Sequence, residues 1–516
     1  MLPPVPSLQS YGISKEYGFL SDELPIEKLS DPYYREWETV VANLQALLLS
    51  RRLKTRINTL PIVTASRLRS DAEWRRAYVL LSFMAHAYIW GGDKPEEVSI
   101  ERSIERLSLN LKPQQRVPPT ISIPFTQVCK YLKLPTVATY AGVCLWNYKP
   151  IFSDEPIDNL ENLSTLATFT GSLDESWFYL VSVAIEARGG PIIKWMLDAI
   201  KAARADDSRA VTACLQLTAE RLDELGTLLQ RMYENCDPHV FYHRIRPFLA
   251  GSKNMAEAGL PNGVIFDTGR GDERYVQYGG GSNAQSSLIQ FFDIVLGVEH
   301  RPTGSQKPSD SSTESEAEGP SSPPPRHNFI HDMRSYMPGK HREFLQDVAS
   351  VANVHEYVTA NKSNVALRTA FDACLAMVRS LRDKHIQMVS RYIIVKSRES
   401  RSHSRSLSPR NAPNNQPQPL NLANTLPSKN SRNGGKKLKG TGGTALIPFL
   451  KQARDETGEP AIDAWARRML SNAPGGSSPS VAALGKMGEH PDGVMEITGL
   501  AGTWSLDDSE GGLCHW

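Results

Sequence analysis

One long amphipathic segment constrains the fold of this chain more than any other feature. Residues 364–395 carry apolar side chains at steps of three and four, the spacing of one face of a helix. That face consists of Leu367, Phe371, Cys374, Val378, Leu381, His385, Met388 and Tyr392. The segment therefore predicts a long helix with a buried stripe, and it places His385 inside the core.

Similar helical patterns recur along most of the chain. They cover Trp37–Leu49, Asp71–Trp90, and residues 126–147, 175–187, 191–203, 208–235 and 238–249. The first 30 residues, rich in Pro, Gly and aromatic side chains, indicate an extended arm laid over the fold. The proline-rich residues 110–125 predict a connector, and only a short stretch after Pro150 has β-like character. The fold class predicted is mainly α.

Three regions depart from globular composition. Residues 301–326 are rich in Ser, Pro, Glu and Gly and predict a disordered insertion. Residues 396–439 begin with an Arg-Ser run and end basic, and residues 471–516 read as a Gly/Ser-rich disordered tail. A basic run suggests either a nucleic-acid contact or a mobile loop in a soluble enzyme, and the second interpretation is favoured.

Charge and cysteine content narrow the class of protein. The formal net charge of +2 gives no overall attraction to nucleic acid or membranes. The six cysteines have no CxxC spacing and indicate reduced thiols in a cytosolic protein. Because no signal peptide or apolar run of about 18 residues is present, we expect a soluble cytoplasmic protein without membrane or nucleic-acid partners.

Two interpretations of His385 remain open from the pattern alone. A lone histidine on an apolar helix face is most often a core residue hydrogen-bonded to a carbonyl. The functional interpretation is a neutral imidazole that ligates haem iron, with the apolar stripe packed against the porphyrin. Two other histidines, His86 and His341, are interpreted as structural.

A glycine-rich junction adds a second constraint. In residues 279–297, GGGSNAQSSLIQFFDIVLG, an irregular loop leads into a helix with apolar residues at helical spacing. Such a junction allows a ligand to approach the backbone closely, although most such junctions bind nothing. A second segment, FIHDMRSYMPGKHREFL at residues 329–345, follows. Together they resemble the two signature segments of the indoleamine 2,3-dioxygenase family, and the chain is most similar to its fungal members.

This resemblance implies a fold and an activity. The fold would have a small N-terminal domain, residues 1–168, and a large helical haem domain, residues 169–470. One haem b per chain would serve a dioxygenase that cleaves L-tryptophan or a related indoleamine with O2 to N-formylkynurenine. That reaction begins the kynurenine route towards NAD and needs an electron donor that keeps the haem ferrous. A monomer is expected.

The resemblance also assigns cofactor-binding residues. RSLRDKHIQMVSRYI resembles the helix with the proximal ligand, so His385 would ligate the haem iron. Arg382 would pair with a haem propionate or with an acid such as Asp293, and a solvated helix arginine is the alternative. Gly281 and Ser282 would border the haem edge.

The substrate residues come from four further segments. WFYLVS resembles the distal helix, with Phe178 against the indole and Ser182 facing the ligand side of the haem. In VFYHRIRPFLAG, Phe241 would line the indole pocket and Arg246 would hold the substrate carboxylate, whereas Arg244 would lie on the surface. No general base is evident among them. The remaining predicted pocket residues are Tyr140, Val143, Ser282, Asn283 and Thr441.

Other classes of function stay open at this point. The same fold could serve as an oxygen-binding haem protein without dioxygenase activity. An oxygen carrier, however, needs no guanidinium that holds a substrate carboxylate. The Arg-Ser and basic segments could belong to a regulatory interaction protein with a degenerate haem site. An enzyme of the same class that prefers another indoleamine is the third alternative.

Overall fold

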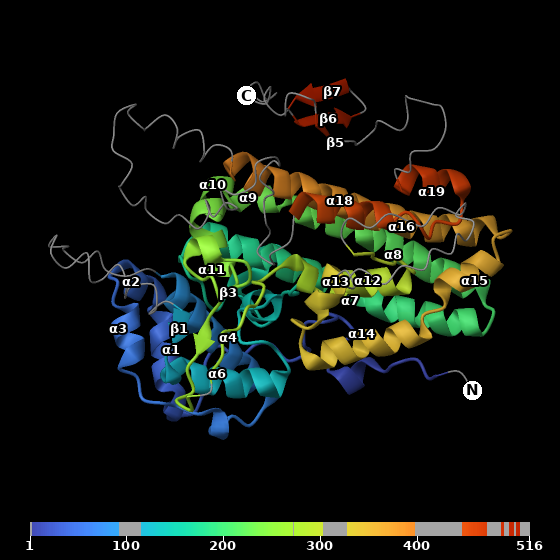
Figure 1. Ribbon diagram of the computed structural model, residues 1–516. Coiled ribbons are helices and arrows are strands. Elements are labelled where there is room, and N and C mark those ends of the chain that lie inside the picture. Colours follow the sequence, from blue (N-terminus) through green and yellow to red (C-terminus); the bar gives the residue numbers. More distant parts are fainter. Residues whose placement is uncertain are drawn as a thin grey trace, which may run out of the picture.

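The computed structural model describes residues 3–91, 115–271, 273–302, 328–397 and 446–471, together with three short strands between residues 487 and 505. Most of the predicted insertion 301–326, loop 396–439 and tail therefore lies outside the described residues, as does Thr441. Within the described residues the chain is mainly helical (Figure 1), which confirms the predicted fold class.

The first helices gather at one end of the molecule (Figure 1). Helix α4 begins with a capping box, because Ser70 Oγ accepts from the Glu73 N–H at 3.2 Å and the Glu73 carboxylate accepts from the Ser70 N–H at 3.1 Å. Its central residues are buried against α1 and α6. The elements here are η2 (Pro32–Tyr34), α1 (Arg35–Ala42), α2 (Leu44–Leu49), α3 (Leu53–Asn58), η3 (Ala65–Arg67), α4 (Asp71–Trp90), α6 (Pro119–Leu132), η6 (Ala141–Leu145) and η7 (Leu160–Asn162). The first element of the chain, η1 (Leu8–Tyr11), instead contacts α14 (Gly339–Val351).

Three long helices form the other end. Helix α8 packs against both α7 and α16, and α18 lies on α16 (Figure 1). This arrangement gives the amphipathic stripe of residues 364–395 the partners that it requires. The remaining helical elements of the described residues are α7 (Leu173–Arg204), α8 (Ser208–Gln230), α9 (Met232–Asn235), α10 (Pro238–Val240), η8 (Phe241–Ile245), α11 (Arg246–Leu249), η9 (Ala256–Ala258), η10 (Asn283–Gln285), α12 (Ser287–Val295), α13 (Phe329–Arg334), α14 (Gly339–Val351), α15 (Val354–Ala360), α16 (Val365–Val389), η11 (Ser390–Val395), α18 (Leu446–Glu456) and α19 (Ala464–Ser471). Of these, α11 contacts α4.

Strands are few and short among the described residues. Strand β1 (Arg116–Val117) pairs in parallel with β4 (Ile265–Phe266), and β2 (Tyr148–Pro150) pairs antiparallel with β3 (Leu163–Thr165). Strands β5 (Met487–Glu489), β6 (Met495–Gly499) and β7 (Gly502–Ser505) form an antiparallel sheet within residues 471–516, for which the sequence predicts a disordered tail. No helix in the described ranges is long and apolar enough to cross a membrane.

Prolines explain two differences from the helix bounds predicted by sequence. Helix α6 begins at Pro119, inside the predicted connector, because proline is well suited to the first turn of a helix. Helix α7 runs unbroken through Pro191, whereas the sequence predicts separate helices before and after this residue. The loss of one backbone hydrogen bond at Pro191 is offset by extensive packing of α7 on α8 and α12.

The N-terminal arm contacts α7 where this helix lacks side chains. A Cβ atom added at Gly190 would lie 2.5 Å from both the Gly18 nitrogen and the Tyr17 carbonyl carbon. Backbone therefore packs directly on backbone at this point, which agrees with the arm expected from the first 30 residues.

We expect Gly190→Ala to lower the free energy of unfolding by about 1–3 kcal/mol, because the added methyl group has no space. Urea denaturation followed by circular dichroism would measure this change. Gly226→Ala on α8 is the control, because the methyl group added there meets only the flexible side chain of Lys384 and the gain in helix propensity is the same. An unchanged stability of the Gly190→Ala variant would contradict the close arm contact.

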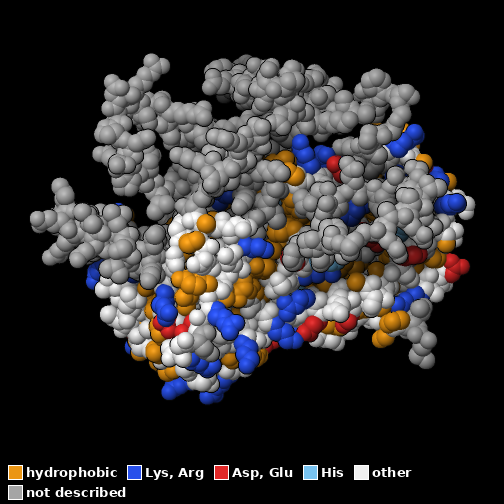
Figure 2. Space-filling view, viewed as in Figure 1, with side chains coloured by type: hydrophobic (Ala, Val, Ile, Leu, Met, Phe, Trp, Pro, Cys, Tyr) orange, Lys and Arg blue, Asp and Glu red, His pale blue; other side chains and the backbone are white. Residues whose placement is uncertain are grey.

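One connected cluster of buried hydrophobic residues extends from Leu8 to Ala461 and includes both ends of the molecule. The predicted division at residue 168 therefore stays a prediction. On the visible face, Lys and Arg side chains are spread over the N-terminal helices, with apolar side chains between them (Figure 2).

Candidate functional site

A cavity lies between α7, α16, α12, η8 and α18. Its volume is about 260 Å³, close to the lower end of the roughly 300–1,000 Å³ of ordinary small-molecule pockets. Its wall is mostly apolar. The predicted site residues that line it are Tyr140, Val143, Phe178, Ser182, Phe241, Arg246, Gly281, Ser282, Asn283, Arg382 and His385.

His385 reaches this cavity from α16. The neighbouring stripe residues Val378, Leu381 and Met388 also line it, so the imidazole stands in an apolar wall. Burial, with a smaller contribution from the Arg382 charge, lowers the pKa of His385 to about 4. The ring is therefore neutral near pH 7, which is the state in which an imidazole nitrogen binds a metal.

Arg382 belongs to a buried network of charges beside the cavity. Its Nη2 donates to both carboxylate oxygens of Asp293, at 2.7 and 2.8 Å, so the predicted pairing with Asp293 is present and the solvated alternative is wrong. His300 donates to Asp293 Oδ2 at 3.0 Å and to Glu456 Oε2 at 2.6 Å. Burial lowers the pKa of His300, but the Asp293 and Glu456 carboxylates have the larger combined effect, so the pKa is raised. The network fastens α18 to α12 and α16.

Phe241 and Arg246 share one face for a reason that the sequence does not reveal. They are five positions apart, which would place them on different faces of an α-helix. Residues Phe241–Ile245 instead form a π-helical turn, in which hydrogen bonds join residues five apart. Both side chains consequently line the cavity, while Arg244 is exposed, as predicted.

Aromatic rings form one end of the cavity. The Phe178 and Phe241 rings lie 4.7 Å apart between centroids, and Phe241 meets Tyr392 edge-on at 5.6 Å. Ser182, one turn after Phe178 on α7, presents a hydroxyl to the same space. This end combines a flat apolar slot with one hydroxyl group and the Arg246 guanidinium.

The glycine loop is shaped mainly by its own backbone packing. A Cβ atom at Gly280 would lie 2.0 Å from the Leu249 carbonyl oxygen, so glycine is required there for close approach of two chain segments. Gln285 then connects the loop to the cavity wall. Its amide donates to the Gly280 carbonyl at 2.8 Å, and its carbonyl accepts from the Tyr140 N–H at 2.9 Å.

The two histidines interpreted as structural lie away from the cavity wall. His86 Nε2 accepts from the Ala138 N–H at 2.8 Å, so Nδ1 carries the proton and donates to the Phe248 carbonyl at 2.7 Å. His341 packs on Phe19 and lies 3.2 Å from the Ser287 hydroxyl. Both are satisfied core residues, which confirms their interpretation.

Sequence reasoning missed several parts of the site. Glu186 lies behind the wall formed by Tyr140 and Ser286, and nothing in its helical context separates it from other glutamates. The aromatic Tyr392 was placed in the stripe but not in the cavity. Four residues of α18 also line the cavity, and no role was predicted for them: Leu446, Phe449, Leu450 and Ala453.

Comparison with known proteins identifies the family. The model of the family described as indoleamine 2,3-dioxygenase matches residues 7–460. The chain belongs to this family. It is 38% identical over 467 residues to the indoleamine 2,3-dioxygenase of Saccharomyces cerevisiae, covering 88% of this chain and 93% of that protein. The family membership predicted from the sequence is thereby confirmed, and the chain is an enzyme of the oxidoreductase class.

Two further relatives show the range of the indoleamine 2,3-dioxygenase family. A protein of Fusarium equiseti named 6-hydroxytryptophan 2,3-dioxygenase is 34% identical over 450 residues, covering 87% of this chain and 96% of that protein. Human indoleamine 2,3-dioxygenase 2 is 29% identical over 453 residues, covering 87% and 94%. Members with different named substrates thus match this chain over similar lengths.

Proposed function

We propose that this protein is a haem-dependent dioxygenase that cleaves the indole 2,3 bond of L-tryptophan with O2 and forms N-formylkynurenine. The observation that carries the proposal is the cavity itself, in which one neutral imidazole, an aromatic slot and a guanidinium face the same space. The reaction would supply the kynurenine route towards NAD. The free state of the five described cysteines supports a reducing, cytosolic location.

The donor set of the cavity suits one haem b. Within the described ranges no group of three or more His, Cys, Asp or Glu side chains could hold a metal ion. An iron held by His385 alone must bring its remaining ligands with it, as a porphyrin does. Val378, Leu381 and Phe292 would pack on the macrocycle, and Arg382 would lie close to its carboxylates. When bound, the haem would supply the activation of O2.

The remaining cavity residues would bind and orient the substrate. The indole ring would lie against Phe178 and Phe241, and Arg246 would hold the carboxylate through a bidentate, permanently charged fork. Ser282, Asn283 and Thr441 would contact the polar part of the amino acid. Exclusion of water by the apolar wall strengthens each of these interactions.

Arg246 also separates this proposal from the alternatives. An oxygen carrier has no substrate carboxylate, so a buried guanidinium in its ligand cavity would bring only a desolvation cost. Burial lowers the pKa of Arg246, which illustrates this cost. The name of the Fusarium relative supports a second candidate substrate, a ring-hydroxylated tryptophan.

A substrate series tests the proposal. Haem-reconstituted protein with a reductant is supplied with L-tryptophan, 6-hydroxy-L-tryptophan or tryptamine, and ring-opened product is quantified by chromatography. We expect the highest kcat/KM for L-tryptophan and a value about 100-fold lower for tryptamine, which lacks the carboxylate. A preference for 6-hydroxy-L-tryptophan would favour the second candidate. Equal kcat/KM values for tryptamine and L-tryptophan would exclude the proposed contact between Arg246 and the substrate carboxylate.

A further inference from the structure

A buried carboxylate lies directly behind the cavity wall. Glu186 of α7 is 1% exposed, and it follows the cavity residue Ser182 by one helical turn. Its Oε1 accepts hydrogen bonds from the Tyr140 hydroxyl at 3.0 Å and from the Ser286 hydroxyl at 2.6 Å. Its Oε2 is buried and has no hydrogen-bond partner among the described residues.

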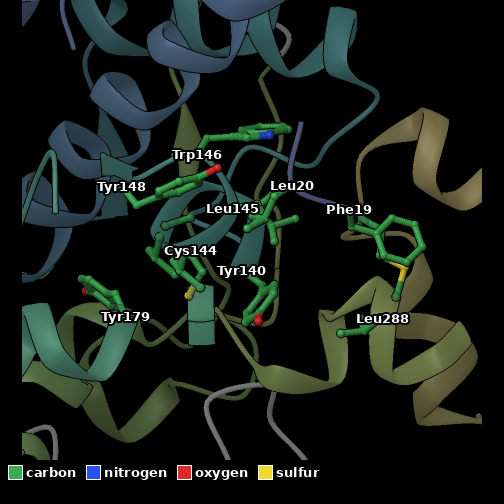
Figure 3. Close-up of a cluster of buried hydrophobic side chains, with 14 of the residues drawn as sticks. Phe19, Leu20, Tyr140, Cys144, Leu145, Trp146, Tyr148, Tyr179 and Leu288 are labelled. Atoms are coloured by element: carbon green, nitrogen blue, oxygen red, sulfur yellow. The ribbon is translucent and has the colours of Figure 1, made fainter. Parts of the chain in front are cut away.

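The two hydroxyls belong to different walls of the cavity. Tyr140 directly precedes η6 and packs in the buried cluster with Cys144 and Leu145 (Figure 3). Ser286 is the N-cap of α12, because its hydroxyl accepts from the Ile289 N–H at 3.2 Å. A single carboxylate oxygen therefore joins three separate elements, and both of its donors line the cavity.

The surroundings of Glu186 make its charge sensitive to pH. Burial raises the pKa of Glu186 to about 7, against a lowering effect of the hydrogen bonds from Ser286 and Tyr140. The titratable side chains that face it are Tyr140 and Cys144, and burial and the Glu186 charge raise both of their pKa values. Neither neighbour ionises near neutral pH, so Glu186 is the member of this group that does.

We propose that Glu186 is a positioning residue for the substrate, which holds Tyr140 and the start of α12 in place through their hydroxyl groups. The inference rests on the proposed function. The ionised carboxylate is a stronger acceptor than the neutral acid, so the wall is held most firmly when Glu186 is charged. The KM for L-tryptophan should accordingly fall as the pH rises from about 6 to about 8, because Glu186 loses its proton in this window.

The substitution Glu186→Gln tests this role. It keeps the shape of the side chain and removes the charge. We expect KM to rise about tenfold at pH 8, kcat to change less than about twofold, and KM to become independent of pH from about 6 to 8. In a Tyr140→Phe background the same substitution should raise KM by a smaller factor than in the presence of Tyr140, because one of the two donors is already absent.

Glu175→Gln is the matched control. Glu175 is also a buried glutamate of α7 that accepts from a tyrosine hydroxyl, that of Tyr179 at 2.9 Å. Unlike the two partners of Glu186, Tyr179 does not line the cavity. Replacement of Glu175 should lower the melting temperature and leave the pH dependence of KM unchanged. A merely structural role for Glu186 would give the same result in both variants and would overturn the proposal.

Two further measurements keep the test decisive. If Glu186→Gln does not fold, Tyr140→Phe and Ser286→Ala each remove one donor and should each weaken the pH dependence of KM. An unchanged dependence in both variants overturns the inference.

If the wild-type protein turns over no tryptophan, the proposed function fails on its own. The dissociation constant of indole, measured by calorimetry, then decides the role of Glu186. The wild type should bind indole more tightly at pH 8 than at pH 6, whereas Glu186→Gln should not. Equal binding by the wild type at both pH values overturns the inference.

Discussion

Replacing Arg246 by alanine should lower kcat/KM for L-tryptophan by about 100-fold, because loss of one partner of a buried charge pair costs roughly 2–5 kcal/mol. The guanidinium lies in an apolar cavity, so water cannot replace it efficiently. The haem absorption spectrum should stay unchanged, since Arg246 lies on the aromatic end of the cavity and His385 on α16. Steady-state kinetics and a visible spectrum of the same preparation measure both quantities.

Arg244→Ala is the control for this variant. Arg244 lies on the same π-helical turn and is exposed, so its loss should change kcat/KM less than about twofold. Arg246→Lys should retain part of the activity, because a lysine keeps the charge and loses the planar fork. The Arg246→Ala variant should also convert tryptophan and tryptamine equally well. A persistent preference for tryptophan would refute the carboxylate assignment.

Replacing His385 by alanine should reduce the affinity for haem by more than about tenfold, because it removes the side chain that would hold the iron. Any haem that remains should lack the absorption bands of an imidazole complex. Haem content per chain is compared between the variant and the wild type after reconstitution and desalting. The absorption spectrum of the ferrous protein is then recorded for both. A normal spectrum would exclude His385 as the iron ligand.

Two controls separate ligation from folding in this experiment. His341→Gln removes another buried imidazole outside the cavity and should leave the haem spectrum unchanged. His385→Gly opens a space at the ligand position, and added imidazole should restore the spectrum there if the ring acts as a ligand. Rescue by imidazole cannot occur if His385 only packs in the core.

The periodicity of the sequence predicted the long helices well. Asp71–Trp90 matches α4 residue for residue, and the stripe of residues 364–395 follows the buried face of α16 and η11. Both segments combine strong caps with regular apolar spacing, so local sequence and tertiary packing favour the same structure. The continuous α7 was missed, because its stability at Pro191 depends on helices that are distant in sequence.

Some residues of the candidate site were likewise predictable from the sequence, and others were not. Residues from several segments that are distant in sequence were assigned to one pocket through the family resemblance. The structure places those among the described residues around one cavity. Phe241 and Arg246 alone would not suggest a common face, because a π-helical turn leaves no clear trace in a sequence. Glu186 could not be predicted, since its partners Tyr140 and Ser286 are about 46 and 100 residues away along the chain.

The most direct test of the central claim follows the oxygen atoms. Haem-reconstituted, reduced protein is mixed with L-tryptophan under ¹⁸O2, and the product is analysed by mass spectrometry before its oxygen exchanges with water. The proposed function predicts N-formylkynurenine that contains two ¹⁸O atoms from one O2 molecule. A stable oxygen complex without product, or a product with a single labelled oxygen, would contradict it.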